Sequence, residues 1–248
     1  MLTPDLLLKA YAAGLFPMAE HRHAADIYWV EPKQRGVLPL DRLHISHSLA
    51  KIVRQDRFCV TSDRAFADVM RACAEPAPGR ENTWINSVIL DAYTELHRRG
   101  HAHSIECWLE DRLVGGLYGV SLGAAFFGES MFSRETDASK VALVHLVARL
   151  RFGGYRLLDT QFITEHLARM GAIEIGRDAY LRRLHLAVRE SADFQRLERD
   201  YSPSAGAASG VFAAGVADEA LGGALERALT VSGPLSGKRI LQLLTQTA

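Results

Sequence analysis

Polar side chains that could move a proton lie within apolar strands in the middle of the chain. Glu129 stands between Gly128 and Ser130 in an otherwise apolar run, and Asp159 and Gln161 lie two residues apart at the end of another. A carboxylate in an apolar strand must be paired, line a cleft or serve a function, because burying an unpaired charge is costly. The alternatives are a satisfied buried acid for Glu129 and, for the other two, caps on the following helix.

Five segments must position these side chains. Alternation predicts a strand over residues 103–109, and residues 113–120 and 124–132 are predicted as the next two strands. Glycines inside the second strand indicate a bulge or a close backbone approach. A helix is expected over residues 138–150, followed by a strand over residues 156–160. This order outlines the fold of the Gcn5-related N-acetyltransferases.

The fold class predicted for the whole chain is α+β, with a mixed sheet flanked by helices. We expect a small N-terminal α/β domain over residues 1–78, an acyltransferase-like catalytic domain over residues 79–190 and a low-complexity, partly disordered tail over residues 191–248. Residues 16–18 are expected in a loop, and residues 31–40 in a connection without regular structure. The apolar residues 238–244 are expected to dock on the rest of the protein.

The composition narrows the classes of partner and compartment. The 248 residues carry 29 basic and 29 acidic side chains, so an RNA partner would have to bind at a local patch. The three cysteines have no CxxC spacing, and no signal sequence or membrane-spanning run is present. We therefore expect a cytoplasmic monomer that does not bind a membrane. Two histidine pairs, at 21/23 and 101/103, lack further ligands, and no metal site is predicted.

Several motifs in one order resemble the leucyl/phenylalanyl-tRNA-protein transferases. They are HSIECW, LVGGLYGV, GESMFS followed by ASK, and LLDTQ, and the resemblance runs from about Thr3 to Glu190. It implies transfer of Leu, also Phe and less well Met, from aminoacyl-tRNA to the α-amino group of proteins that begin with Lys or Arg. The product would be marked for degradation through the bacterial N-degron pathway, and no cofactor is implied.

The resemblance also implies substrate-binding residues. An apolar pocket for the amino acid and a stacking site for the terminal adenosine are implied at Met18, Trp84, Leu117, Ser130, Met131, Leu143 and Leu158. Relatives often carry an aromatic residue where this chain has Met18, so adenosine binding is expected to be weaker or to depend on Trp84. Met and Leu at such spacing also fit an ordinary core, and Trp84 also fits a core anchor.

The implied reaction requires little more than alignment of an amine with an activated ester. The attacking α-amine has a reference pKa of about 7.7 to 8.0, so part of it is neutral at cytoplasmic pH. We expect Asp159 to orient Gln161, whose carbonyl would contact this amine, because an ordinary aspartate is a weak base. Alternatively, Asp159 attracts the cationic N-terminal residue of the acceptor. Glu129 is the natural partner for that residue or for the amino acid's ammonium.

A basic run near the N-terminus is the candidate contact for tRNA. It contains Lys33, Arg35, Arg42, Lys51 and Arg54. A phosphate-contacting patch and a simply solvated helix face are equally compatible with this pattern.

Two other functions remain open from the sequence. An acetyl-CoA-dependent N-acetyltransferase would share the fold, but it needs a Gly-rich turn for pyrophosphate, and the junction SRETDASK has no glycine. An RNA-binding module without activity is the other alternative, and the presence of all three polar side chains argues against it.

Overall fold

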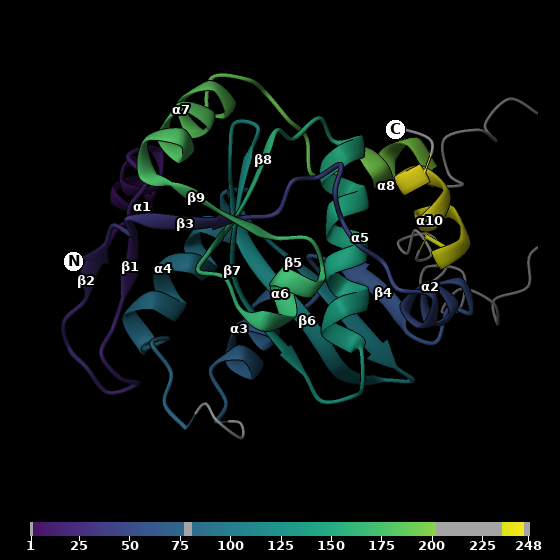
Figure 1. Cartoon of the computed structure of the whole chain (residues 1–248). Coiled ribbons are helices and arrows are strands. Elements are labelled where there is room, and N and C mark those ends of the chain that lie inside the picture. The colour runs from purple at the N-terminus through teal and green to yellow at the C-terminus, as the bar shows by residue number, and fades with distance from the viewer. Residues whose placement is uncertain (1, 77–80, 202–234, 246–248) are drawn as a thin grey trace, which may run out of the picture.

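Strands from both halves of the chain form one mixed sheet in the computed structural model, which describes residues 2–76, 81–201 and 235–245 (Figure 1). Its seven strands lie in the order β4-β5-β6-β7-β8-β3-β9, and only the β7–β8 pair is parallel. They are β4 (Cys59–Ser62), β5 (Ala102–Leu109), β6 (Arg112–Leu122), β7 (Ala125–Ser133), β8 (Leu157–Gln161), β3 (Gln34–Val37) and β9 (Ile173–Gly176). A separate two-stranded sheet contains β1 (Phe16–Met18) and β2 (Tyr28–Val30).

Helices cover both faces of the large sheet and enclose two hydrophobic clusters (Figure 1). The first cluster includes buried residues of α5 (Ala138–Phe152), α2 (His47–Arg54) and α10 (Gly237–Thr245). The second includes residues of α1 (Pro4–Ala12), α3 (Phe66–Cys73), α4 (Ser87–Arg98) and α7 (Arg177–Ala187). Two short helices, α6 (Glu165–Arg169) and α8 (Arg196–Tyr201), follow β8 and α7. The predicted mixed sheet flanked by helices is therefore confirmed.

Glycine allows the close approach of α5 to the sheet. A Cβ atom at Gly115 in β6 would lie 2.4 Å from the Cβ of Ala138, the first residue of α5. Real Cβ atoms do not approach so closely, so a larger residue would push the start of the helix away from the strand. The sequence predicted that glycines in this strand mark a bulge or a close backbone approach, and at Gly115 the close approach is confirmed.

Two short strands were not expected from the sequence. Residues 16–18 were predicted as a loop and residues 31–40 as an irregular connection, but they contain β1 and β3. β3 is only four residues long and includes Arg35 and Gly36, which favour no strand locally. It is a strand because it pairs with β8 on one side and β9 on the other.

The C-terminal region docks as predicted, through α10. Ile240 of this helix is 1% exposed within the first hydrophobic cluster, and the backbone carbonyl of Leu244 accepts a hydrogen bond of 2.8 Å from Arg151 in α5. Most of the predicted low-complexity tail, residues 202–234 and 246–248, lies outside the described residues. β3 and β4, which lie in the predicted N-terminal domain, belong to the same sheet as β5 to β8. The proposed domain boundaries stay a prediction.

Among the described residues, no helix combines the length and the hydropathy needed to cross a membrane.

Candidate active site

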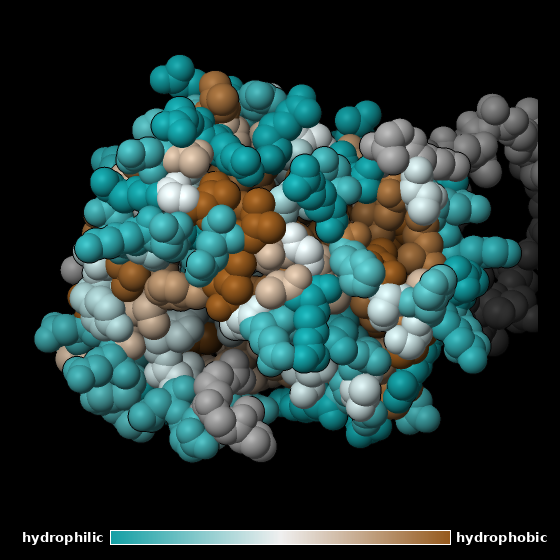
Figure 2. All heavy atoms as spheres, viewed as in Figure 1, coloured by the Kyte–Doolittle hydropathy of each residue, from teal (hydrophilic) through white to brown (hydrophobic). Residues whose placement is uncertain are grey.

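A pocket opens where β7 and β8 separate. Their parallel pairing runs from Ala125 and Leu157 to Phe127 and Asp159, and the residues that follow on both strands line a cavity of about 360 Å³. The lining residues are Phe16, Met18, Trp84, Leu117, Tyr118, Gly128, Glu129, Ser130, Met131, Leu143, Leu146, Leu158, Thr160, Gln161, Phe162, Thr164, His166 and Leu167. Figure 2 shows brown, apolar residues gathered in the middle of the face seen in Figure 1.

A β-bulge presents Glu129 to this pocket. The pairing of β6 with β7 steps from Gly119 opposite Gly128 to Tyr118 opposite Ser130, so Glu129 is the extra residue. Bulges change the direction of a side chain and are frequent beside active sites. The bulge thus lets Glu129 face the cavity while the residues before and after it stay paired with β6.

Neutral groups surround the carboxylate of Glu129. Tyr11 donates a hydrogen bond of 2.6 Å to Oε1, Tyr93 donates one of 3.3 Å to Oε2, and the Gln161 amide donates one of 3.0 Å to Oε1. The hydroxyls of Tyr11 and Tyr93 also contact each other. Burial raises the pKa of Glu129 to about 7, the three hydrogen bonds oppose that rise, and the charge of Asp159 adds to it. A carboxyl group with this pKa can exchange a proton near neutral pH.

Asp159 lies behind the pocket rather than in its wall. It is 0% exposed, and Arg35 holds it through Nε–Oδ1 and Nη2–Oδ2 bonds of 3.0 and 2.6 Å. Tyr180 donates a third hydrogen bond of 2.6 Å to Oδ2. The alternative in which Asp159 attracts a cation of the substrate is therefore wrong, because the carboxylate is enclosed and already paired.

The backbone of Gln161 is held in a sparsely populated conformation. Its φ is 60°, in the left-handed region, and its amide N–H donates a hydrogen bond of 2.7 Å to Oδ1 of Asp159. Strain of this kind concentrates at functional sites. Because the side-chain NH₂ faces the acceptor Glu129, the carbonyl oxygen of Gln161 is directed elsewhere. Asp159 thus orients Gln161, as expected, but through the backbone.

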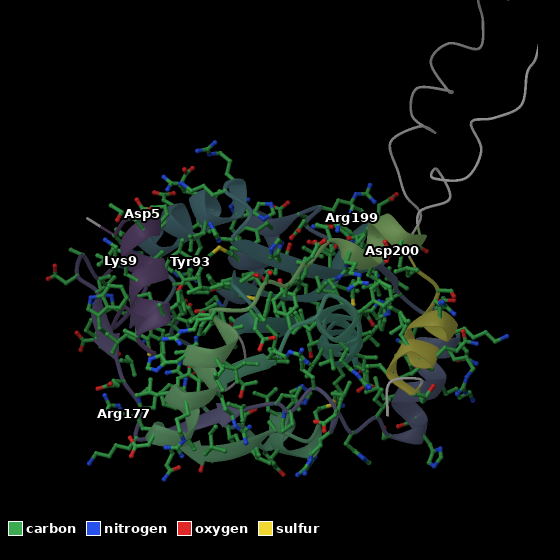
Figure 3. All side chains as sticks on the ribbon, turned by 90° about the horizontal axis from the view of Figure 1, so that it is seen from above. Asp5, Lys9, Tyr93, Arg177, Arg199 and Asp200 are labelled. Atoms are coloured by element: carbon green, nitrogen blue, oxygen red, sulfur yellow. The ribbon has the colours of Figure 1, made fainter. Side chains whose placement is uncertain are left out.

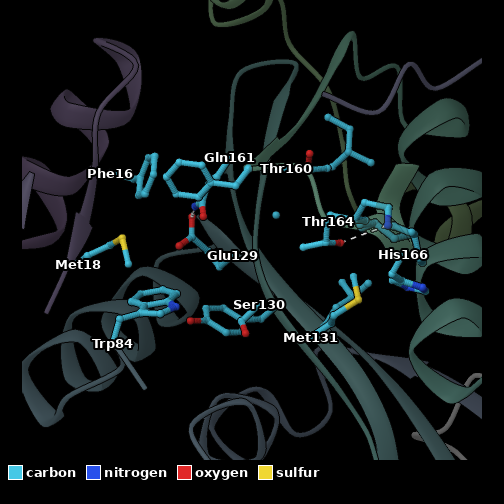
Figure 4. A pocket seen from close by; sticks show the side chains of 18 residues that line it. Phe16, Met18, Trp84, Glu129, Ser130, Met131, Thr160, Gln161, Thr164 and His166 are labelled. Carbon is cyan, nitrogen blue, oxygen red and sulfur yellow. Dashed lines mark hydrogen bonds between the residues drawn. The ribbon is translucent and has the colours of Figure 1, made fainter. Parts of the chain in front are cut away.

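The substrate-binding residues implied by the family resemblance all line the cavity. Met18, Trp84, Leu117, Ser130, Met131, Leu143 and Leu158 are present together with Glu129 and Gln161. Figure 4 shows Phe16, Met18 and Trp84 at one end and Met131, Thr164 and His166 at the other. Glu129 and Gln161 point toward one another between these ends, nearer the first.

Several residues of the site were missed from the sequence. Tyr11 and Tyr93 hydrogen-bond Glu129 but are not among the residues that line the cavity, and neither was a predicted site residue. An internal Tyr needs a partner for its hydroxyl, which was the available signal. In the described part of the chain, the buried hydroxyls of Tyr118 and Thr160 have no hydrogen-bond partner, and both residues line the pocket. Both oxygens are enclosed by protein atoms, so a ligand in the cavity could meet them only after the side chains turn.

The predicted basic patch loses one member. Arg35 is 1% exposed and its guanidinium lies between the rings of Phe16 and Tyr180, with its carbon 4.7 and 4.6 Å from their centroids. Arg35 therefore cannot contact tRNA phosphates. Its role in this structure is to pair with the buried carboxylate of Asp159. The other four residues, Lys33, Arg42, Lys51 and Arg54, are exposed.

Comparisons with known proteins agree with the resemblance seen in the motifs. The family model for "Leucyl/phenylalanyl-tRNA protein transferase" matches residues 37–185, and the model for the N-terminal domain of that family matches residues 1–33. The leucyl/phenylalanyl-tRNA–protein transferase of Rhizorhabdus wittichii is 59% identical over 256 residues, which cover 100% of this chain and 99% of the relative. That of Zymomonas mobilis is 60% identical over 205 residues, which cover 80% and 76%.

Solved structures resemble the chain only distantly. The structure of L-PGS from Bacillus licheniformis aligns with a TM-score of 0.39 and 12% identity, covering 61% of this chain and 56% of that one. Likeness at this level carries no conclusion about fold family or function.

Proposed function

Because this chain belongs to the leucyl/phenylalanyl-tRNA-protein transferase family, we propose that it transfers Leu, also Phe and less readily Met, to proteins that begin with Lys or Arg. The enzyme is an aminoacyltransferase that takes the amino acid from aminoacyl-tRNA and attaches it to a protein N-terminus. One observation supports the proposed amino acids and acceptors above all: Gln161 is hydrogen-bonded to Glu129 in a pocket with an apolar wall.

The amino acid occupies the aliphatic end of the pocket. Leu117, Leu143 and Leu158 are each at most 3% exposed and line that wall together with the more accessible Met131. Flexible and unbranched-at-Cβ side chains make a wall that adjusts to Leu, Phe and Met. An apolar pocket separates ligands by only about 1–3 kcal/mol per methylene, so transfer of all three is expected.

Glu129 and Gln161 act on the attacking amine. The Gln161 carbonyl accepts a hydrogen bond from the α-amino group, which aligns its lone pair with the ester carbonyl. Glu129, with its pKa raised by burial to about 7, accepts the proton that the amine loses as the peptide bond forms. Its negative charge also favours the cationic first residue of the acceptor. The ester oxygen leaves as the ribose hydroxyl of the tRNA and takes the proton that Glu129 accepted from the amine, so Glu129 returns to its ionised form.

Tyr118 and Thr160 line the same pocket, and their hydroxyls have no hydrogen-bond partner among the described residues. Both oxygens are enclosed by protein atoms, so each would have to turn toward the cavity before it could donate to the developing oxyanion. Burial raises the pKa of the Tyr118 hydroxyl, which keeps it protonated. The exposed Lys33, Arg42, Lys51 and Arg54 remain the proposed contacts for tRNA phosphates.

Further parts of the proposal rest on the family and the sequence. The core is proposed to be of the Gcn5-related N-acetyltransferase type, and the enzyme to act as a cytoplasmic monomer in the N-degron pathway. The acetyl-CoA alternative is disfavoured because the loop into α5, residues 133–137, contains no glycine to cradle a pyrophosphate.

Label transfer tests the proposal. Purified protein is incubated with [¹⁴C]leucyl-tRNA and matched peptides that begin with Arg, Lys or Ala, and with [¹⁴C]acetyl-CoA as the control donor. Label from leucyl-tRNA should appear on the Arg and Lys peptides only. Label from acetyl-CoA, or equal labelling of the Ala peptide, would contradict the assigned donor or acceptor respectively.

A further inference from the structure

The two ends of the pocket differ in chemical character. Met131 lies at one end with Thr164 and His166, and Phe16 and Trp84 mark the other end (Figure 4). The leucines of the pocket wall belong to the same hydrophobic cluster as Met131, so we call the first end aliphatic. Phe162 also lines the pocket, and its ring lies against Phe16 with centroids 5.8 Å apart and planes at 82°. Phe162 therefore belongs to the aromatic end.

Phe162 is unusually accessible for a ring that lines a pocket. It is 49% exposed, whereas Phe16 beneath it is 1% exposed. Its edge-to-face contact with Phe16 restrains the ring, and about half of the residue is still exposed. A fixed, open aromatic face at the mouth of a pocket suits a flat ligand that can stack on it.

The fold holds this ring in place through the backbone on either side. Gln161 before it has a φ of 60° and is bound to Asp159, which sets the direction in which the chain leaves β8. A Cβ atom at Gly36 in β3 would come within 3.0 Å of the carbonyl carbon of Phe162. The segment after β8 thus passes closely over β3, and Gly36 makes this approach possible.

The proposed donor has a flat group of the required kind. An amino acid esterified to the 3′ end of tRNA is joined to a ribose that carries adenine, and bases stack on aromatic side chains with about 1–3 kcal/mol each. When the amino acid occupies the aliphatic end and the ester lies beside Glu129 and Gln161, the nucleoside falls at the aromatic end. Met18 on the same wall has no π face to offer.

We propose that Phe162 is a nucleobase-binding residue that stacks on the terminal adenine of the donor at the aromatic end of the pocket. With Trp84 it supplies the aromatic surface that Met18 does not. This inference rests on the proposed function, since it assumes an aminoacyl-nucleoside donor.

Two small donors isolate the contribution of the base. The KM of the wild-type enzyme is measured for 3′-leucyl-adenosine and for the leucyl ester of 1-deoxyribose, which lacks the base, with one Arg-starting peptide. In Phe162→Leu the KM for leucyl-adenosine should rise at least about fivefold, the lower limit for one stacked base, while the abasic ester is unaffected. Phe162→Tyr, which restores a ring, should recover the wild-type KM.

Controls separate stacking from structural roles. Leu186→Ala removes another exposed apolar side chain, 65% exposed on α7, and should change neither KM. Equal changes for both donors, or a change only in the KM for the peptide, would overturn the inference. Thermal melting of each variant shows whether Phe162→Leu is folded, and Phe162→Ala repeats the comparison if it is not. Failure of the wild type to transfer leucine from any donor would instead refute the proposed function.

Discussion

Two carboxylates on neighbouring strands have opposite surroundings. Asp159 is enclosed with the cation Arg35 and the hydroxyl of Tyr180, a set that we call the buried pair layer. Glu129 lies in the pocket, where the described donors to it, Tyr11, Tyr93 and Gln161, are all neutral. The two carboxylates lie on paired strands, β7 and β8, and differ in the charge of their hydrogen-bond partners. Asp159, which is paired with a cation, serves the structure, whereas Glu129, which has neutral partners, can exchange a proton.

The buried pair layer is also connected to the pocket. Asp159 binds the backbone N–H of Gln161, and the Gln161 side chain binds Glu129. Figure 3 shows Tyr93 on the same side of the molecule as Asp5 and Lys9 of α1, the helix that carries Tyr11. The reactive carboxylate is therefore supported by helices on one side and by the buried pair layer on the other.

Removing the cation from the buried pair layer should have the largest effect. Arg35→Met leaves Asp159 enclosed without a positive partner, and breaking a buried pair in this way typically costs about 3–5 kcal/mol. The free energy of unfolding, measured by urea titration, should fall by this amount. Arg177→Met, which breaks the exposed pair with Glu31, should cost at most about 1 kcal/mol. Similar losses in both variants would mean that the buried pair has no special role.

Glu129→Gln should mainly affect the reaction. The amide keeps the shape of the side chain but cannot accept the proton of the amine, and loss of a general base typically lowers turnover about 100-fold or more. Single-turnover rates with saturating donor and peptide give this value directly. In the wild type the rate should rise with pH through about 7, where Glu129 becomes ionised, and the variant should lack this step. A variant with full activity would exclude Glu129 as the base.

The same substitution should change how stability depends on pH. Burial raises the pKa of Glu129 from 4.5 to about 7, so the folded protein keeps this proton over a range in which the unfolded chain has lost it. The contribution of Glu129 to stability is therefore complete below about pH 4.5 and declines as the pH rises through 7. Melting temperatures between pH 4.5 and 8 should show a steeper decline for the wild type than for Glu129→Gln. Parallel curves would mean that the pKa of Glu129 is not raised.

Two tyrosine variants each remove one hydroxyl, the first from the buried pair layer and the second from the surroundings of Glu129. Tyr180→Phe removes a donor to the ionised Asp159 and should cost about 1.5–3 kcal/mol of stability, with the pH dependence of the rate unchanged. Tyr11→Phe removes a donor that lowers the pKa of Glu129, so the rise in rate should move to higher pH. A shift of about half a pH unit would lower the rate at pH 7 about twofold, because the ionised fraction of Glu129 falls from about one half to about one quarter. The same change in stability and in the pH dependence of the rate for both variants would contradict the different roles assigned to Asp159 and Glu129.

Much of the fold was predictable because its signals are local. The strand and helix boundaries around Glu129 follow from alternation, helical periodicity and glycine punctuation, and they agree with β5 to β8 and α5. β3 was missed because a four-residue strand with Arg35 and Gly36 has no periodic pattern of its own. The basic run misled for the same reason, since its other members, Lys33, Arg42, Lys51 and Arg54, are exposed whereas Arg35 is enclosed.

The sequence by itself determined the family, the order of the strands and the helix around Glu129, and the pocket residues that the family motifs imply, because motifs and periodicity are carried by contiguous residues. Only the tertiary structure decided the roles of the two carboxylates. Arg35 is 124 positions from Asp159 and Tyr11 is 118 positions from Glu129, so no local pattern reports these contacts. The protonation of a buried acid depends on the groups that enclose it, and folding brings those groups together from distant parts of the chain.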